Sequence, residues 1–349
     1  MSEDRHTAKS QLTPLQRFLG SRLVTGVGMF LSKHVPPPVG YAIGGLIVEP
    51  INWLKPDVYW IVHANLRQVV GPQVDEETLH RLVRQVFRNT ARNNYDLWHL
   101  VARGQKAIRA AIHFPPDTQA HLDQALGCGK GVIIGGAHTG NFDLGILALA
   151  DQGLEVQVLG LAAPPAGGFD LMDQMRAHAG VRLTSISVPA LREAINRLRA
   201  GGVVLTGVDR PVSDAEQGAE PSPLPGGGRR EVKPSPLPGG SQREVKPSPL
   251  PGGGRRGVEF FGRPAPLPTG HVRLALKTGA VILVAGSYRD PQRGNVVRLS
   301  PPLEMIRTGD RDEDLRVNLR RVTAWLEEFI RAWPEQWAMF VPVWPEQHP

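Results

Sequence analysis

A histidine and an aspartate stand close together in a segment that could carry out proton transfer. His138 and Asp143 lie in the sequence GVIIGGAHTGNFDLG, which covers residues 131–145. On one continuous helix, five positions would turn the two side chains roughly 140° apart. They meet only if His138 lies in a turn and Asp143 in the first turn of a helix. Gly140 between them permits such a turn.

This pair is suited to general base catalysis. A neutral imidazole can take a proton from an alcohol, and a carboxylate on its other nitrogen fixes the tautomer and stabilises the imidazolium. We therefore predict His138 as the base and Asp143 as its partner. The backbone N–H groups of Gly140 and Asn141 are expected to stabilise an oxyanion near the helix N-terminus. The spacing alone leaves another interpretation open, a loop histidine that is merely hydrogen-bonded to a nearby carboxylate.

The elements around the motif must hold it at the edge of a sheet. A buried strand is expected over 131–136 and a helix over 142–150. Further strands are predicted at 154–161, 181–187, 202–208 and 280–288, and helices at 75–98, 118–126 (capped by Asp117), 169–179, 189–200, 269–278 and 312–333. This alternation predicts an α/β fold with a mixed, mostly parallel central sheet covered by helices. In such sheets, functional residues gather at the carboxyl ends of strands.

A second group of polar residues follows the predicted strand 202–208. It begins with Asp209 and Arg210, and Arg210 is suited to holding a phosphate or another anion near a strand end. An ordinary salt bridge with Asp209 or another carboxylate is the alternative for Arg210. Further along, Gly262 and several prolines are expected to form an irregular loop. We assign Asp209, Arg210 and Gly262 to substrate binding.

The N-terminal region, residues 1–74, is predicted to associate with a membrane. Its apolar stretch 39–54 is interrupted by Glu49 and Pro50, whereas a spanning helix needs about 20 unbroken apolar residues. Such a stretch either lies on a bilayer surface or packs in a core. The neighbouring Trp53 and Trp60 favour the surface.

Composition narrows the class of protein. The 349 residues are 41% hydrophobic and 21% charged, which excludes a wholly disordered chain, a coiled coil and a multi-span membrane protein. A net charge of +7 favours an anionic partner such as a membrane surface or a phosphorylated substrate. No nucleic-acid signature is present, so no specific nucleic acid is expected. Cys128 is the single cysteine, and the 11 histidines lack H-x-x-x-H or H-E-x-x-H spacing, so no metal is expected.

One segment does not fit a globular element. The sequence PSPLPGG begins at Pro221, Pro234 and Pro247, giving a repeat rich in proline and glycine. Proline removes backbone donors and glycine costs entropy to order, so neither suits a helix or a central strand. We predict that 219–257 is a disordered insertion within a single domain formed by 75–218 and 258–349.

Several motifs together resemble a known family: HTGNFD at 138–143, VDRP at 208–211, VEFFGRPAPLPTG at 258–270, LALKTGA at 274–280 and WPEQWAMFVPVW at 333–344. In this order they are similar to the bacterial lysophospholipid acyltransferase superfamily. The nearest branch comprises the lipid A biosynthesis (lauroyl/myristoyl) acyltransferases and the related phosphatidylinositol mannoside acyltransferases. The resemblance covers about Leu46 to Trp344 outside the repeat, and it implies an acyltransferase-like α/β fold.

The resemblance also implies an activity. It indicates O-acyl transfer from acyl-CoA or acyl carrier protein to a hydroxyl of a membrane glycolipid or lysophospholipid, without a cofactor, by a peripheral protein at the cytoplasmic face of the inner membrane. His138 would be the base, Asp143 its partner, and Glu259 a further catalytic residue because it stands just before FFG. Two features depart from the family pattern: the repeat lies between Asp209 and FFG, and no clear N-terminal membrane helix is present. The alternatives are an inactive lipid- or anion-binding protein of the same fold and a thioester hydrolase.

Overall fold

The computed structural model describes residues 22–160, 181–212 and 257–344. The predicted helix 169–179 and the repeat at 219–257 lie outside these residues. The helices are α2 (Arg22–His34), α3 (Pro37–Leu54), α4 (Asp57–Val70), α5 (Glu76–Val101), α6 (Gln105–Ala111), α7 (Pro116–Gly127), α8 (Phe142–Asp151), α10 (Val188–Arg199), α12 (Gly270–Thr278) and α13 (Arg311–Ala332), with a 3-10 turn η1 (Pro334–Gln336). The strands are β1 (Ile112–His113), β2 (Val132–Gly136), β3 (Val156–Gly160), β4 (Val181–Ser185), β5 (Val203–Gly207), β6 (Val258–Phe260), β7 (Arg263–Ala265), β8 (Val281–Asp290) and β9 (Gly294–Leu299).

A seven-stranded sheet forms the centre, in the order β1-β9-β8-β2-β5-β3-β4. The five strands from β8 to β4 are parallel, while β9 runs antiparallel to β8 and β1 pairs with β9 in parallel. The expected mixed, mostly parallel sheet is therefore confirmed. Strand β2 is central, and its residues Val132, Ile133 and Ile134 are all buried, as parallel strands covered on both faces require.

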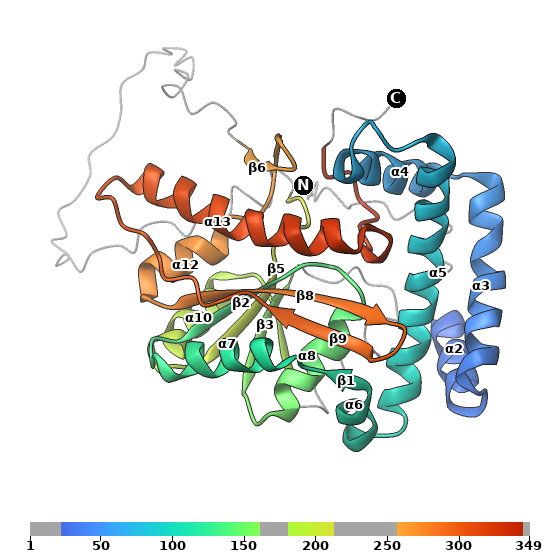
Figure 1. Ribbon diagram of the computed structural model, residues 1–349. Helices are drawn as coiled ribbons and strands as arrows, with labels where there is room; N and C mark the ends of the chain where they lie inside the picture. Colours follow the sequence, from blue (N-terminus) through green and yellow to red (C-terminus); the bar gives the residue numbers. More distant parts are fainter. Residues whose placement is uncertain (1–21, 161–180, 213–256, 345–349) are drawn as a thin grey trace, which may run out of the picture.

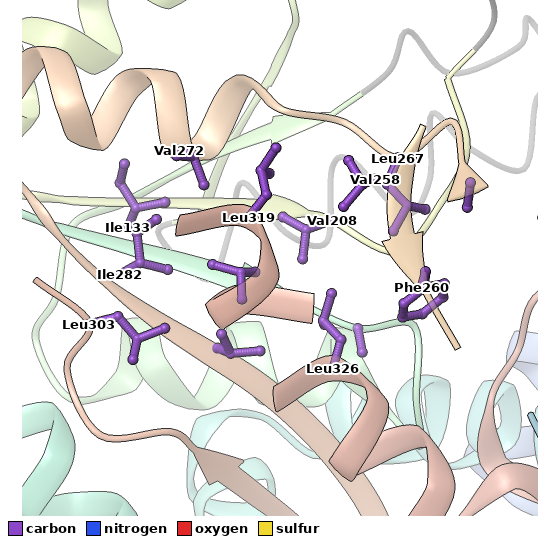
Figure 2. Packing of buried hydrophobic residues seen from close by; sticks show 14 of the residues in the cluster. Ile133, Val208, Val258, Phe260, Leu267, Val272, Ile282, Leu303, Leu319 and Leu326 are labelled. Carbon is purple, nitrogen blue, oxygen red and sulfur yellow. The ribbon is translucent and has the colours of Figure 1, made fainter. Parts of the chain in front are cut away.

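Helices cover both faces of the sheet, with α12 and α13 on one side and α7 and α8 on the other (Figure 1). Ile133 of β2 belongs to the first core cluster, together with residues of α10, α12 and α13. Its neighbours Val132 and Ile134 point to the opposite cluster, which includes residues of α7 and α8. Figure 2 shows the first cluster, in which Val272 lies near Ile133 and Ile282, while Leu326 lies toward Phe260. Alternate side chains of each strand thus anchor the two helical layers.

The N-terminal helices form a separate group beside the sheet, where α3 and α5 lie side by side (Figure 1). In the described part of the chain, no helix combines the length and the apolar character that a membrane crossing requires. Helix α3 runs through Glu49 and Pro50 to Leu54, so these residues interrupt the apolar character of the stretch, as expected, but not the helix. Pro50 has no backbone N–H to donate, and the longer helix tolerates the loss of this one hydrogen bond.

Two local predictions are corrected by the structure. Asp117 does not cap α7, because this helix begins at Pro116 after Pro115 and Asp117 lies in its first turn. The segment around Gly262 is not an irregular loop but a β-hairpin of β6 and β7. Phe261 and Gly262 both adopt positive φ, 48° and 74°, as a two-residue hairpin turn requires. The strands β1 and β9 were not predicted.

Candidate active site

The site is built at the carboxyl ends of two neighbouring parallel strands, β2 and β5. Gly136, the last residue of β2, pairs with Gly207, the last residue of β5. Val208 then donates its N–H to the carbonyl of Gly136 at 3.1 Å. Two residues beyond each glycine stand His138 and Asp209, so the strand register brings these two side chains to the same place.

Asp209 holds the imidazole of His138. Nδ1 of His138 lies 2.6 Å from Oδ1 of Asp209, and the backbone N–H of His138 donates to Oδ2 at 2.8 Å. The indole N–H of Trp337 also donates to Oδ2, at 2.8 Å. Asp209 is fully buried, whereas the side chain of His138 is 28% exposed. A carboxylate at Nδ1 favours the tautomer with its proton there, so Nε2 is left as the basic nitrogen.

The charges around His138 set its basicity. Burial alone lowers the pKa of His138, but the charge and hydrogen bond of Asp209 outweigh it, so the pKa lies above its ordinary value. Arg210 lowers this pKa and Asp143 raises it through their charges. Burial raises the pKa of Asp209, yet the charge of His138 and the donors around the carboxylate bring it below its ordinary value. The pair therefore favours a proton on the imidazole and a charged Asp209.

The structure places Asp209, and not the predicted Asp143, at Nδ1 of His138, while the role of Asp143 as partner of the imidazole stays a prediction. The carboxylate that hydrogen-bonds the imidazole is Asp209, which sequence analysis assigned to substrate binding. Asp143 lies in the first turn of α8, as predicted, and acts on His138 through its charge. Neighbouring strands bring Asp209 to Nδ1 across 71 residues of sequence, a distance that spacing along the chain does not reveal.

Gly140 and Asn141 are used to fix the loop. Gly140 has φ of 52°, and a Cβ there would lie 2.5 Å from the carbonyl oxygen of Ser287, so only glycine fits. Its N–H donates to the carbonyl of Gln336 at 2.9 Å, which corrects its predicted role as an oxyanion donor. The Asn141 side chain accepts from the N–H of Leu144 at 3.4 Å and caps α8. Both residues thus hold His138 in position.

A segment near the C-terminal end of the described chain closes over the loop. Trp337 is buried and pairs with Thr139 in an isolated bridge, and Ala338 donates its N–H to the carbonyl of His138 at 2.8 Å. Gln336 also accepts, through its side chain, the N–H of Arg289 at 2.7 Å. Residues 336–338 are therefore bonded both to the His138 loop and to Asp209.

This support reaches the N-terminal helices. Arg289 of β8 forms a short ion pair with the buried carboxylate of Asp96 on α5. Tyr41 of α3 donates its hydroxyl to the same carboxylate at 2.5 Å and accepts from Arg289 at 3.1 Å. Burial and the charge of Asp96 raise the pKa of Tyr41 to about 12, so the phenol stays neutral. Helices α3 and α5 are thus bonded to the strand that carries Arg289.

Comparison with known proteins identifies the family of this chain. The family model of the bacterial lipid A biosynthesis acyltransferases matches residues 8–219 and 253–346. The chain belongs to this family. Membership indicates an acyltransferase that uses an acyl donor and a lipid-type acceptor. No curated protein matches the sequence. The match leaves out 220–252, which lie within the predicted insertion.

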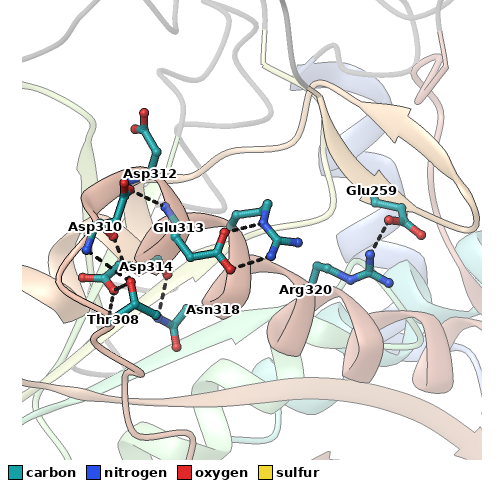
Figure 3. Close-up of polar contacts among 9 residues, drawn as sticks. Glu259, Thr308, Asp310, Asp312, Glu313, Asp314, Asn318 and Arg320 are labelled. Carbon is teal, nitrogen blue, oxygen red and sulfur yellow. Dashed lines mark hydrogen bonds and ion pairs between the residues drawn. The ribbon is translucent and has the colours of Figure 1, made fainter.

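In this member of the lipid A acyltransferase family, the remaining predicted site residues are Arg210, Glu259 and Gly262. Arg210 is exposed next to Asp209, and no carboxylate of the described ranges forms the salt bridge that was the alternative to its predicted anion binding. Glu259 of β6 forms an ion pair with Arg320 of α13 at 2.7 Å, with both side chains about half exposed (Figure 3). This pairing does not include His138 or Asp209, and the catalytic role of Glu259 stays a prediction. Gly262 lies in the hairpin turn that follows Glu259.

Sequence analysis did not single out Trp337, Gln336 or Asn93 as parts of the site. Asn93 donates its side-chain N–H to the carbonyl of Gly140 at 2.7 Å and accepts from Asn141 at 2.9 Å through its own carbonyl. For Asn93, the sequence offered one signal: a pair of neighbouring polar residues interrupts the otherwise apolar stripe of the helix 75–98. For Trp337 the signal was the family motif WPEQW, whose contacts become visible only in the fold.

Proposed function

We propose that the protein transfers a fatty acyl group from acyl-CoA or acyl carrier protein to a hydroxyl of a membrane glycolipid or lysophospholipid. The observation that carries this proposal is the hydrogen bond from Nδ1 of a partly exposed His138 to the carboxylate of Asp209. When the imidazole is neutral, this contact keeps its proton on Nδ1 and leaves Nε2 to accept a proton from an alcohol. Family membership supports the acyl chemistry.

In the proposed reaction, His138 acts as the base in one acyl transfer. Nε2 takes the proton of the acceptor hydroxyl as its oxygen bonds to the thioester carbonyl carbon. The resulting tetrahedral oxyanion collapses, the carbon–sulfur bond breaks, and the imidazolium returns its proton to the thiolate. Asp209 stabilises the imidazolium in between, and the first-turn N–H groups of α8, including that of Asn141 at its cap, are suited to the oxyanion. These steps need no metal or organic cofactor.

The substrates require an anion site and a lipid surface. Arg210 is exposed beside Asp209, so it is suited to a phosphate of the donor or of the acceptor headgroup. An incubation with radiolabelled acyl-CoA or acyl carrier protein and dispersed glycolipid or lysophospholipid tests the transfer directly. Acylated lipid supports the proposal. Free fatty acid without acylated lipid indicates a thioester hydrolase, and lipid binding without turnover indicates an inactive protein.

We further propose that the protein attaches peripherally to an anionic membrane, at the cytoplasmic face of the inner membrane, through its N-terminal helices. Seven large hydrophobic side chains are exposed on α2, α3 and α4: Phe30, Val39, Leu46, Ile47, Trp53, Leu54 and Trp60. Along α3 they recur at intervals of seven or eight residues, which places them on one stripe. Trp53 is 86% exposed and Leu46 is 71% exposed. This apolar stripe is suited to the boundary of headgroups and acyl chains.

A double substitution on this stripe tests the attachment. Leu46→Ser with Trp53→Ser should lower partition onto anionic phospholipid vesicles by about 100-fold, since burying each large apolar side chain contributes about 1.5–3 kcal/mol. Vesicle co-sedimentation measures the effect. The matched control is Ile186→Ser with Val188→Ser, two exposed apolar residues at the start of α10. Equal vesicle binding by both double variants would contradict the assignment, and turnover of a detergent-dispersed acceptor should be unchanged.

The insertion 219–257 is proposed to be dispensable for the fold. The described residues on the two sides of the repeat lie near the end of β7. Val212 donates its N–H to the carbonyl of Pro266 at 3.0 Å, and the backbone of Gly257 lies against Ala265. After deletion of 219–257, the six residues 213–218 would join Val212 to Val258. Because loop entropy changes by about 0.6 kcal/mol per doubling of length, deletion should shift the Tm by no more than a few degrees. A fall of 10 °C or more in calorimetry, roughly 3 kcal/mol, would contradict it.

A further inference from the structure

Three side chains of the N-terminal helices converge away from the active site. His63 comes from α4, and Glu76 and His80 come from α5. Each offers one ligand atom, and these atoms all lie within 4.8 Å of one another. Glu76 and His80 are four positions apart and so project from the same side of α5. The acyl-transfer steps make no use of this group.

The chemistry of the three side chains fits a divalent transition metal. Two imidazoles and one carboxylate form a ligand set that zinc uses, with bonds of about 2.0–2.2 Å to nitrogen and oxygen. In a tetrahedral site, such bonds place the ligand atoms about 3.3–3.6 Å apart. Nε2 of His63 already lies 3.0 Å from Oε2 of Glu76. Rotamer adjustments of about 1 Å would therefore complete the geometry, with no movement of the helices.

Neighbouring side chains contact Glu76 and His80 through atoms other than the ligand atoms inferred here. Arg67 forms a short ion pair with Oε1 of Glu76, which leaves Oε2 for the ion. The buried Tyr59 places its hydroxyl 2.6 Å from Nδ1 of His80, so in the site inferred here Nε2 would be the ligand atom of His80 and the contact with Tyr59 would be kept. Hydrogen bonds of this kind orient metal ligands and fix the histidine tautomer.

We propose that His63, Glu76 and His80 bind Zn²⁺ and that the ion joins α4 to α5. Glu76 is 63% exposed, so the ion has a route in from solvent and a water can complete the coordination. The cations that face the group are already engaged: Arg67 binds the other oxygen of Glu76, and Lys55 lies over the rings of Tyr59 and Trp60. The ligands come from two helices, which is why no single-helix histidine spacing predicts the site.

Metal binding by the full-length protein, purified without a histidine tag and freed of metal by a chelator, tests the proposal. Isothermal titration with Zn²⁺ should give one site, and Co²⁺ should give the visible absorption of a four-coordinate ion. His63→Gln and His80→Gln should each weaken binding by about 100-fold or more, since even outer-sphere changes cost 10–100-fold. The matched control is His34→Gln, an exposed histidine of α2 that should bind as the parent does.

Thermal unfolding gives a second readout that is independent of acyl transfer. A hundredfold excess of Zn²⁺ over its Kd should raise the Tm of the parent by about 5 °C and leave that of His80→Gln unchanged. Glu76→Gln keeps the shape of an exposed side chain, so it tests the site even if a histidine variant does not fold. Zinc affinities that are equal in the parent and in all three ligand variants, or no binding to the parent, would overturn the proposal.

Discussion

Replacing His138 with alanine should lower the rate of acyl transfer by about 10²- to 10⁴-fold, the usual contribution of a general base. The variant keeps the binding surfaces but has no Nε2 to take the hydroxyl proton. Single-turnover assays with a labelled acyl thioester and a dispersed lipid acceptor measure the chemical step directly. The matched control is His121→Gln, because His121 bonds the carbonyl of Leu299 on the other side of the sheet and should leave the rate unchanged.

A second substitution separates lost chemistry from lost structure. The alanine variant leaves the buried carboxylate of Asp209 with two remaining donors, the backbone N–H of His138 and the indole of Trp337. His138→Gln retains an amide that can donate to Asp209 yet cannot act as a base at neutral pH. Both variants should be equally slow, while the glutamine variant should be the more stable in urea unfolding. Near-parental turnover by either one would show that another group takes the proton.

Replacing Asp209 with asparagine should change both the rate and its dependence on pH. The base must be neutral, so kcat/KM of the parent should rise with pH through the pKa of His138, which lies above its ordinary value of about 6.5. In Asp209→Asn the burial that lowers this pKa remains, as does the charge of Arg210, while the opposing carboxylate is gone. The acidic limb should therefore move to lower pH than in the parent. The plateau should fall about 10²-fold or more, because the tautomer is no longer fixed.

Asp143→Asn is the informative comparison for that profile. It removes a charge that raises the pKa of His138 but leaves the hydrogen bond of Asp209 to Nδ1. We expect a smaller shift of the acidic limb in the same direction and a plateau near that of the parent. If instead Asp143→Asn were the slower of the two variants, the partner inferred from the family motif would be the operative one. The pH–rate profiles of the two variants thus decide between the carboxylates.

Much of the sheet could be predicted because its strands are buried on both faces. β2 and β5 are short runs of valine, leucine and isoleucine that end in glycine, a pattern typical of parallel strands between helical layers. β9 lacks this simplicity, since Asn295 and Arg298 interrupt its apolar residues. β8 also extends past Tyr288 to Asp290, beyond the apolar run, because it pairs with β9 there.

The site was predictable in its elements and not in its contacts. The position of His138 after a buried strand and of Asp143 in a helical turn follows from local residue patterns. The pairing of His138 with Asp209 follows from which strand lies beside β2, a fact of topology that chain spacing does not contain. The same holds for Trp337, whose bond to Asp209 joins residues 128 positions apart. The local position of the site residues was therefore easier to predict than the long-range hydrogen bonds that join them.

The reliance of the histidine loop on residues 336–338 has a consequence for protein synthesis. Trp337 and Ala338 supply bonds to Asp209 and to the carbonyl of His138, and both are translated long after the loop itself. A nascent chain that has already formed its sheet lacks these bonds until this late segment leaves the ribosome tunnel and docks. The order of synthesis therefore implies that His138 and Asp209 reach their described geometry only after residues 336–338 have docked.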